Sequence, residues 1–254
     1  MADKADTLAG CFGLGMIPTG AADPNGLRRC ALGIIRIMLD FGLTIDVRQF
    51  FAKAQQLYGD RQWKLAPHDA LDKLMEFFAA RLRNYFMSQG QDTLLVDAAL
   101  GAGAEDVKDC GARLAALAAF SQATDYEAAV QTFKRVANIL RKQGQAEDLS
   151  DHWDPALLRE DAEKDLAAVL EEMLPRLDAL WATHDHAAAL ACLSDVRPAV
   201  DAFFAGVMVM CDEADLRHRM EAYREAFRSR YENSDIIYAS KAFLNKEVAR
   251  IAEA

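Results

Sequence analysis

Apolar residues recur at helical spacing along most of the chain, and the runs are separated by short polar or glycine-rich breaks. No alternation with the two-residue period of a strand occurs before residue 235. The sequence therefore predicts an all-α fold, a helical bundle with a short irregular or strand-like C-terminal tail. The predicted helices span residues 2–8, 26–42, 46–57, 67–90, 93–100, 104–121, 130–142, 155–183 and 198–210.

Two breaks in this pattern are rich in residues that disfavour helices. Residues 10–25 carry four glycines and two prolines, and we predict a structured loop there. Residues 144–154 are polar and acidic, and we predict a second loop. Proline is favoured in the first turn of a helix and distorts a helix from within. We therefore expect Pro155 and Pro198 to begin helices, and Pro175 to kink one.

The helix predicted over residues 130–142 has two opposed faces of different chemistry. Val130, Phe133, Val136, Ala137 and Leu140 share one side of a 3.6-residue wheel. The other side carries Lys134, Arg135, Asn138, Arg141 and Lys142. Such a row of cations can neutralise phosphates while the apolar side anchors the helix, which favours contact with a nucleic-acid backbone. The alternative is a solvated helix face, the commoner situation for charged helix surfaces.

Composition restricts the classes of function. A chain of 254 residues that is 52% hydrophobic can bury a sizeable core in one large or two small domains. The formal net charge of -10 argues against general affinity for nucleic acid, so any contact must come from local basic patches. No apolar run approaches the roughly 18 residues of a membrane-spanning helix, and the N-terminus lacks the pattern of a signal peptide. We expect a cytoplasmic protein without a membrane partner.

Metal and redox chemistry have weak support in the sequence. The five cysteines are widely spaced, mostly among apolar neighbours, and are expected to be reduced thiols without a metal cluster. Residues 2–8 resemble the last helix of an HD-type domain, in which Asp3 is the matching metal ligand, but the upstream histidine ligands are absent. His184 and His186 lack an evident third ligand, and we interpret both as surface residues. Asp201 follows Arg197 at the i+4 spacing of a helical ion pair.

Four segments occur in the order of one known family. They are PTGAADPNGLRRCALGIIRIML (18–39), RLRNYFMSQG (81–90), KRVANIL (134–140) and RPAVDAFFAGVMVMCDE (197–213). Together they resemble the C-terminal part of the beta subunit of bacterial glycyl-tRNA synthetase over about residues 1–215. The resemblance implies a helical tRNA-binding tail whose last part is similar to the anticodon-binding domain of arginyl-tRNA synthetases.

This resemblance implies tRNA and the synthetase alpha subunit as partners, because the alpha subunit holds the glycine and ATP site. ATP and magnesium belong to the holoenzyme, and no cofactor, metal or catalytic residue is expected in this chain. The implied domains are the end of an HD-like domain with linker helices (1–60), a tRNA-binding domain (61–215) and a fused segment (216–254). The resemblance implies Arg81 and Arg83 as tRNA-binding residues, and the charge segregation over residues 130–142 adds Lys134, Arg135, Asn138 and Arg141.

The last segment, residues 216–254, has a different resemblance. Its sequences AYREAF and IIYASKAF are similar to the start of diaminopimelate decarboxylase, a pyridoxal phosphate enzyme. In that family the lysine at the position of Lys241 forms a Schiff base with the cofactor. The join would fall near Leu216–Arg217. The alternative functions are therefore a fragment of a pyridoxal phosphate-dependent decarboxylase and a non-catalytic helical interaction scaffold.

Overall fold

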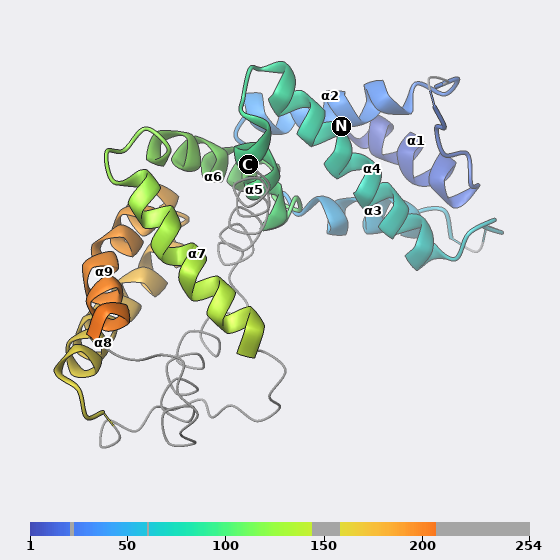
Figure 1. The fold of residues 1–254 in the computed structure, drawn as a ribbon. Helices are drawn as coiled ribbons and strands as arrows, with labels where there is room; N and C mark the ends of the chain where they lie inside the picture. The colour runs from blue at the N-terminus through green and yellow to red at the C-terminus, as the bar shows by residue number, and fades with distance from the viewer. Residues whose placement is uncertain (21–22, 60, 144–157, 207–254) are drawn as a thin grey trace. The chain divides into compact units, whose positions relative to one another are not determined.

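The computed structural model of the chain describes residues 1–20, 23–59, 61–143 and 158–206. Within these ranges the fold is all-α, as predicted, with nine helices and one isolated backbone bridge between Asp46 and Asp106 (Figure 1). The helices are α1 (Ala2–Gly13), α2 (Leu27–Asp40), α3 (Val47–Gln56), α4 (Pro67–Ser88), α5 (Thr93–Gly101), α6 (Val107–Phe120), α7 (Tyr126–Gln143), α8 (Asp161–Ala182) and α9 (His186–Gly206). None of these helices combines the length and the apolar character that crossing a bilayer requires.

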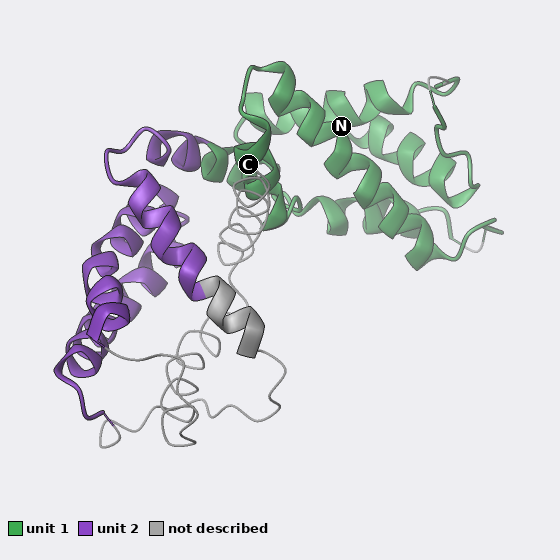
Figure 2. Cartoon of the chain, in the orientation of Figure 1, with its two compact units in different colours: residues 1–114 green, residues 115–254 purple. Residues whose placement is uncertain are grey.

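The chain divides into two compact units, residues 1–114 and 115–254 (Figure 2). The division falls inside α6, whereas the sequence placed a boundary after residue 60. Helices α3 and α4 lie on either side of residue 60, and both pack against α1 in unit 1. Packing between helices that are distant along the chain therefore sets the extent of this unit.

Unit 1 is built around α1, which packs against α2, α3 and α4. Its core contains three fully buried phenylalanines, Phe12, Phe51 and Phe78. The rings of Phe51 and Phe78 meet edge to face, with centroids 5.5 Å apart. Removing such a side chain from water contributes about 1.5–3 kcal/mol, so the aromatic core is a main source of this unit's stability. The apolar positions predicted for α2, from Leu27 to Met38, are buried here as well.

Helix α1 extends through Gly10 to Gly13, and the prediction of a loop for this stretch is wrong. The two glycines lie beneath aromatic side chains. A Cβ atom would lie 1.9 Å from the Trp63 ring at Gly13, and 2.4 Å from the Tyr58 hydroxyl oxygen at Gly10. The Tyr58 hydroxyl also donates a hydrogen bond to the Asp6 carbonyl at 3.0 Å. These glycines allow the Tyr58 and Trp63 side chains to pack closely against α1. A high density of glycine in the sequence therefore does not mark a loop here.

In unit 2, α8 and α9 pack along one another, and α7 packs on α9. The core is mainly aliphatic: Leu166, Leu170, Met173, Leu174 and Leu177 of α8, with Cys192, Val196, Val200 and Phe203 of α9. Pro175 lies inside α8, as expected, while the kink expected there stays a prediction. Pro198 lies inside α9, which begins twelve residues earlier, at His186, so the prediction that this proline begins a helix is wrong.

The start of α8 also differs from the prediction. The helix begins at Asp161, and residues 158–160 are described as non-helical, so a helix that starts at Pro155 is wrong. Glu160 and Glu163 form a capping box in which the buried Glu163 carboxylate accepts from the backbone N–H of Glu160 at 3.0 Å. This reciprocal bonding satisfies the unpaired N–H groups of the first turn and fixes the start of the helix. The polar break predicted for residues 144–154 lies outside the described residues.

Candidate nucleic-acid interface

The first half of the amphipathic pattern predicted for residues 130–142 is found in the described part of α7, residues 130–136. Val130 is buried, and Phe133 and Val136 pack against the core of unit 2. Thr132, which the sequence assigned to neither face, is buried with 6% of its surface exposed. One side of α7 is therefore held in the fold, which fixes the direction in which Lys134 and Arg135 project.

Arg135 is exposed and lies over an aromatic ring of α9. Its Cζ atom is 4.2 Å from the centroid of the Phe204 ring, and its Nη2 donates to the Phe204 carbonyl oxygen at 3.4 Å. Lys134 is half-buried. Among the residues that the structure describes, neither cation has a carboxylate within ion-pair distance. Within the part of the chain that the structure describes, both positive charges thus remain available to a phosphate.

A hydrogen bond between side chains joins α7 to α9 near Lys134 and Arg135. The Thr132 hydroxyl donates to Asp201 Oδ1 at 2.7 Å. The other oxygen, Asp201 Oδ2, lies 3.7 Å from Arg197 Nη1, so the ion pair predicted between these two residues is confirmed. From the sequence, Thr132 is only a polar residue within a half-buried helix. That pattern does not predict that its hydroxyl binds Asp201. Because Thr132 and Arg197 hold this carboxylate, it does not neutralise the cations of α7.

Arg83, a predicted tRNA ligand, is bonded within unit 1. Its Nε and Nη2 donate to the two carboxylate oxygens of Asp97 at 2.6 and 3.2 Å, and this fork joins α4 to α5. The hydrogen bond with Asp97 raises the pKa of the Arg83 guanidinium above its ordinary value. Arg83 Nη1 lies 3.1 Å from the Met87 sulfur. Most of its donors are therefore engaged in the fold.

Arg81, the neighbouring candidate, is also engaged with its own helix. Its Cζ atom lies 5.6 Å from the centroid of the Phe77 ring. Its Nε is buried, with no hydrogen-bond partner among the described residues. Arg81 and Arg83 belong to unit 1, whereas Lys134 and Arg135 belong to unit 2. The six residues predicted from the sequence thus fall into two separate groups.

The remaining candidates lie partly or wholly outside the description. Asn138 and Arg141 are on the last turns of α7, and their side chains lie outside the described residues. Lys241, the lysine of the decarboxylase alternative, lies outside them entirely. The roles of these three residues stay predictions.

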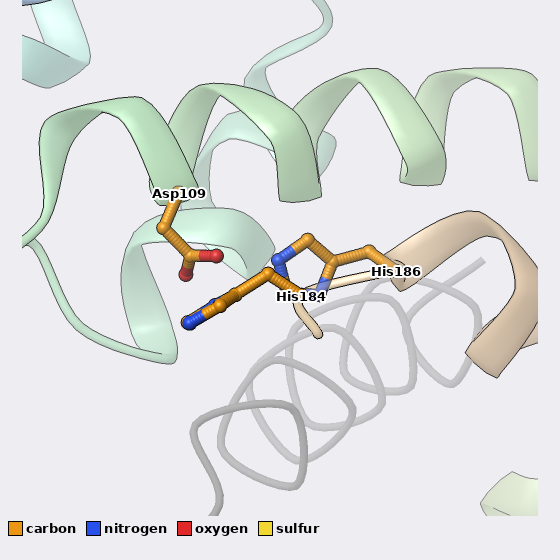
Figure 3. Close-up of side chains that lie close together, drawn as sticks. All are labelled: Asp109, His184 and His186. Atoms are coloured by element: carbon orange, nitrogen blue, oxygen red, sulfur yellow. The ribbon is translucent and has the colours of Figure 1, made fainter. Parts of the chain in front are cut away.

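The histidine pair between α8 and α9 is only partly as expected (Figure 3). His184 is exposed and has a left-handed φ of 56°, but His186 is buried, so its assignment to the surface is wrong. Their ring centroids are 6.0 Å apart. Asp109, also drawn in Figure 3, belongs to unit 1, where its carboxylate lies 3.3 Å from Nε of the buried Arg113. The absence of a metal site stays a prediction, and Asp3 is exposed on α1.

The cysteines within the described residues are free thiols. Cys110 and Cys192 are buried, and Cys11 and Cys30 are partly exposed. Burial raises the pKa of Cys110 from its ordinary value of 9.0 to about 12. Cys211 lies outside the described residues. A buried thiol with a raised pKa is a poor nucleophile and behaves as a small apolar side chain.

Two known domain families match this chain. Residues 1–101 match the glycyl-tRNA synthetase beta subunit family, and residues 130–229 match the DALR anticodon binding domain. The first match lies within unit 1, and the second covers most of α7 and all of α8 and α9. The DALR match continues past the join predicted at Leu216–Arg217, whereas the decarboxylase resemblance stays a prediction.

Curated relatives agree with these matches. Glycine–tRNA ligase beta subunits from Nitratidesulfovibrio vulgaris strain Hildenborough and Oleidesulfovibrio alaskensis are 64% and 59% identical over 219 residues, which cover 85% of this chain. The beta subunit from Shewanella woodyi is 39% identical over 233 residues, or 91% of the chain. The chain spans about a third of the length of these relatives, 32% for the first two and 33% for the third.

Proposed function

Because residues 1–101 match the glycyl-tRNA synthetase beta subunit family and residues 130–229 the DALR anticodon-binding family, we propose that this chain binds tRNA through the basic face of α7. The single observation that carries the proposal is the position of Lys134 and Arg135. They project from a helix whose opposite face packs on the core, and no carboxylate among the described residues pairs with them. In an acidic chain, such a local patch provides the attraction for phosphate.

The role that follows is recognition, without any bond-making chemistry in this chain. Within a complete glycyl-tRNA synthetase, the chain would support the attachment of glycine by holding the tRNA. The alpha subunit would supply the glycine and ATP site, so ATP and magnesium would act there. The DALR match supports the assignment of tRNA contact to unit 2, because it contains the whole basic face of α7.

The test is the salt dependence of tRNA binding by the full chain. Replacing both Lys134 and Arg135 by alanine should weaken binding, and should flatten the plot of log affinity against log salt concentration by roughly 0.7–0.9 for each phosphate that the variant no longer neutralises. Lys164→Ala is a control for the loss of a positive charge elsewhere in the same unit, because Lys164 lies on α8 and pairs with Asp161 at 3.5 Å. An unchanged slope in a folded double variant would show that this face is only solvated.

A further inference from the structure

Arg135 lies over the ring of Phe204, which meets the buried Phe203 ring edge to face. Phe203 is buried, and the centroid of its ring lies 5.5 Å from that of Phe204. Phe204 is half-buried and packs against the core of unit 2, and the Arg135 guanidinium lies over its ring. The guanidinium is planar, so if one of its faces is covered by the ring, the other face is directed outward. The hydrogen bond from Nη2 to the Phe204 carbonyl restricts its rotation.

This arrangement differs from that of the other arginine beside a phenylalanine. Arg81 is further from its ring, at 5.6 Å from the centroid of Phe77, and its Nε is buried. Arg135 combines the shorter distance of 4.2 Å with an exposed side chain. A contact with phosphate alone does not require a guanidinium held over a ring, because a flexible lysine provides the same charge. A restrained planar cation is the group on which a nucleobase can stack.

We propose that Arg135, supported by Phe204, is a stacking platform for an unpaired base of the bound tRNA. The proposal rests on the proposed function and gives two residues of α7 different ligands. Lys134 contacts phosphate, and Arg135 contacts a base. The ligand is a single-stranded loop, since bases in a duplex are already stacked on each other and present no face. Restraint of Arg135 before binding lowers the entropic cost of ordering the base.

The experiment compares two RNA hairpins with the same stem, using the full chain. One hairpin has a seven-nucleotide loop, and in the other the loop bases are replaced by abasic residues, which keep every phosphate. Arg135→Lys keeps the charge but removes the planar group. We expect it to weaken binding of the first hairpin about tenfold with an unchanged salt slope, and to leave binding of the abasic hairpin unchanged. Lys134→Ala should lower the salt slope on both hairpins.

Phe204→Leu provides a second test, because it keeps apolar packing but removes the ring beneath the guanidinium. In a variant whose circular dichroism shows an intact fold, we expect the same selective loss of affinity for the loop hairpin. The proposal is overturned if Arg135→Lys binds the loop hairpin as tightly as the unmodified chain, or if it loses equal affinity for both hairpins. If the unmodified chain binds neither the hairpins nor tRNA, the proposed function itself fails, and the stacking platform fails with it.

Discussion

Arg83 of unit 1 and Arg135 of unit 2 have different kinds of partner. In unit 1, three arginines contact carboxylates: Arg48 with Asp72 at 2.8 Å, Arg83 with Asp97 at 2.6 Å, and Arg113 with Asp109 at 3.3 Å. In unit 2, Arg197 pairs with Asp201 at 3.7 Å, whereas Arg135 lies over the Phe204 ring. A carboxylate that binds a guanidinium cancels its charge locally and engages its donors. A guanidinium over an aromatic ring keeps its positive charge and most of its donors for another partner. Arg83 therefore stabilises the packing of α4 on α5, whereas the charge of Arg135 is available to a ligand.

The cores of the units differ as well. Unit 1 packs aromatic side chains against helix glycines, and at Gly13 the approach leaves no space for even one methyl group. Unit 2 packs mostly leucine and valine, and a Cβ at Gly206 would meet the Ala162 Cβ at 3.4 Å, an ordinary contact. Unit 1 should therefore be sensitive to added volume at Gly10 and Gly13, and unit 2 should tolerate it at Gly206.

The largest expected effect tests this difference directly. Gly13→Ala should lower the free energy of unfolding by about 2–3 kcal/mol, because the Trp63 ring must move away from the new methyl group. Gly13 has no left-handed φ, so alanine adds no backbone strain there, and its higher helix propensity alone would stabilise the helix by about 1 kcal/mol. Urea unfolding followed by circular dichroism measures the change.

Gly206→Ala is the matched control in unit 2, with an expected change in the free energy of unfolding of less than about 0.5 kcal/mol. A Gly13→Ala variant as stable as the unmodified chain would remove the distinction between the two cores.

A second change sharpens the contrast between arginines. Arg83→Ala should cost about 2 kcal/mol of stability, because it removes the two hydrogen bonds that Arg83 donates to the mostly buried Asp97 carboxylate. Lys134→Ala should cost less than about 0.5 kcal/mol, since Lys134 forms no ion pair among the described residues. Thermal or urea unfolding gives both values.

Binding of tRNA should show the reverse order, with Lys134→Ala weakening binding more than Arg83→Ala at a temperature where both variants are folded. If Arg83→Ala instead weakens tRNA binding without a loss of stability, Arg83 is a tRNA ligand, as the sequence predicted. The assignment of Arg83 to the fold would then be wrong.

The smallest effect concerns alkaline pH and the buried Cys110 of unit 1. Its folded pKa of about 12 lies above its ordinary value of 9.0, so the unfolded chain releases the thiol proton first as the pH rises. The stabilising contribution is complete below pH 9 and is lost as the pH rises from there towards 12. By pH 10 the loss should be on the order of 1 kcal/mol, because the unfolded chain has then lost its thiol proton over about one pH unit.

The measurement for Cys110 is the difference in unfolding free energy between pH 8 and pH 10, compared between the unmodified chain and Cys110→Ala. Other groups titrate equally in both proteins, so the difference between the two pH dependences isolates this thiol. Equal pH dependences would show that the thiolate is tolerated at this position, and that the interior of unit 1 is less apolar than its contacts indicate.

Local periodicity determined much of the fold before any contact was known. The boundaries of α2, α3, α4 and α5 agree with the predicted helices to within a few residues, because caps and apolar spacing act over one or two turns. The segregation of charge on α7 is equally local, since residues three and four apart share a face. The all-α fold and the candidate basic helix were for this reason readable from the sequence alone.

Tertiary structure decided what could not be read locally. Gly13 meets Trp63, 50 residues further along the chain, and Arg135 meets Phe204, 69 residues away. Nothing within one turn of Arg83 or Arg135 shows that the first will find a carboxylate and the second an aromatic ring. The position of a residue in a helix fixes the direction in which its side chain projects. Whether that side chain is buried, and whether its charge and donors are already engaged, depends on the partner that folding brings to it.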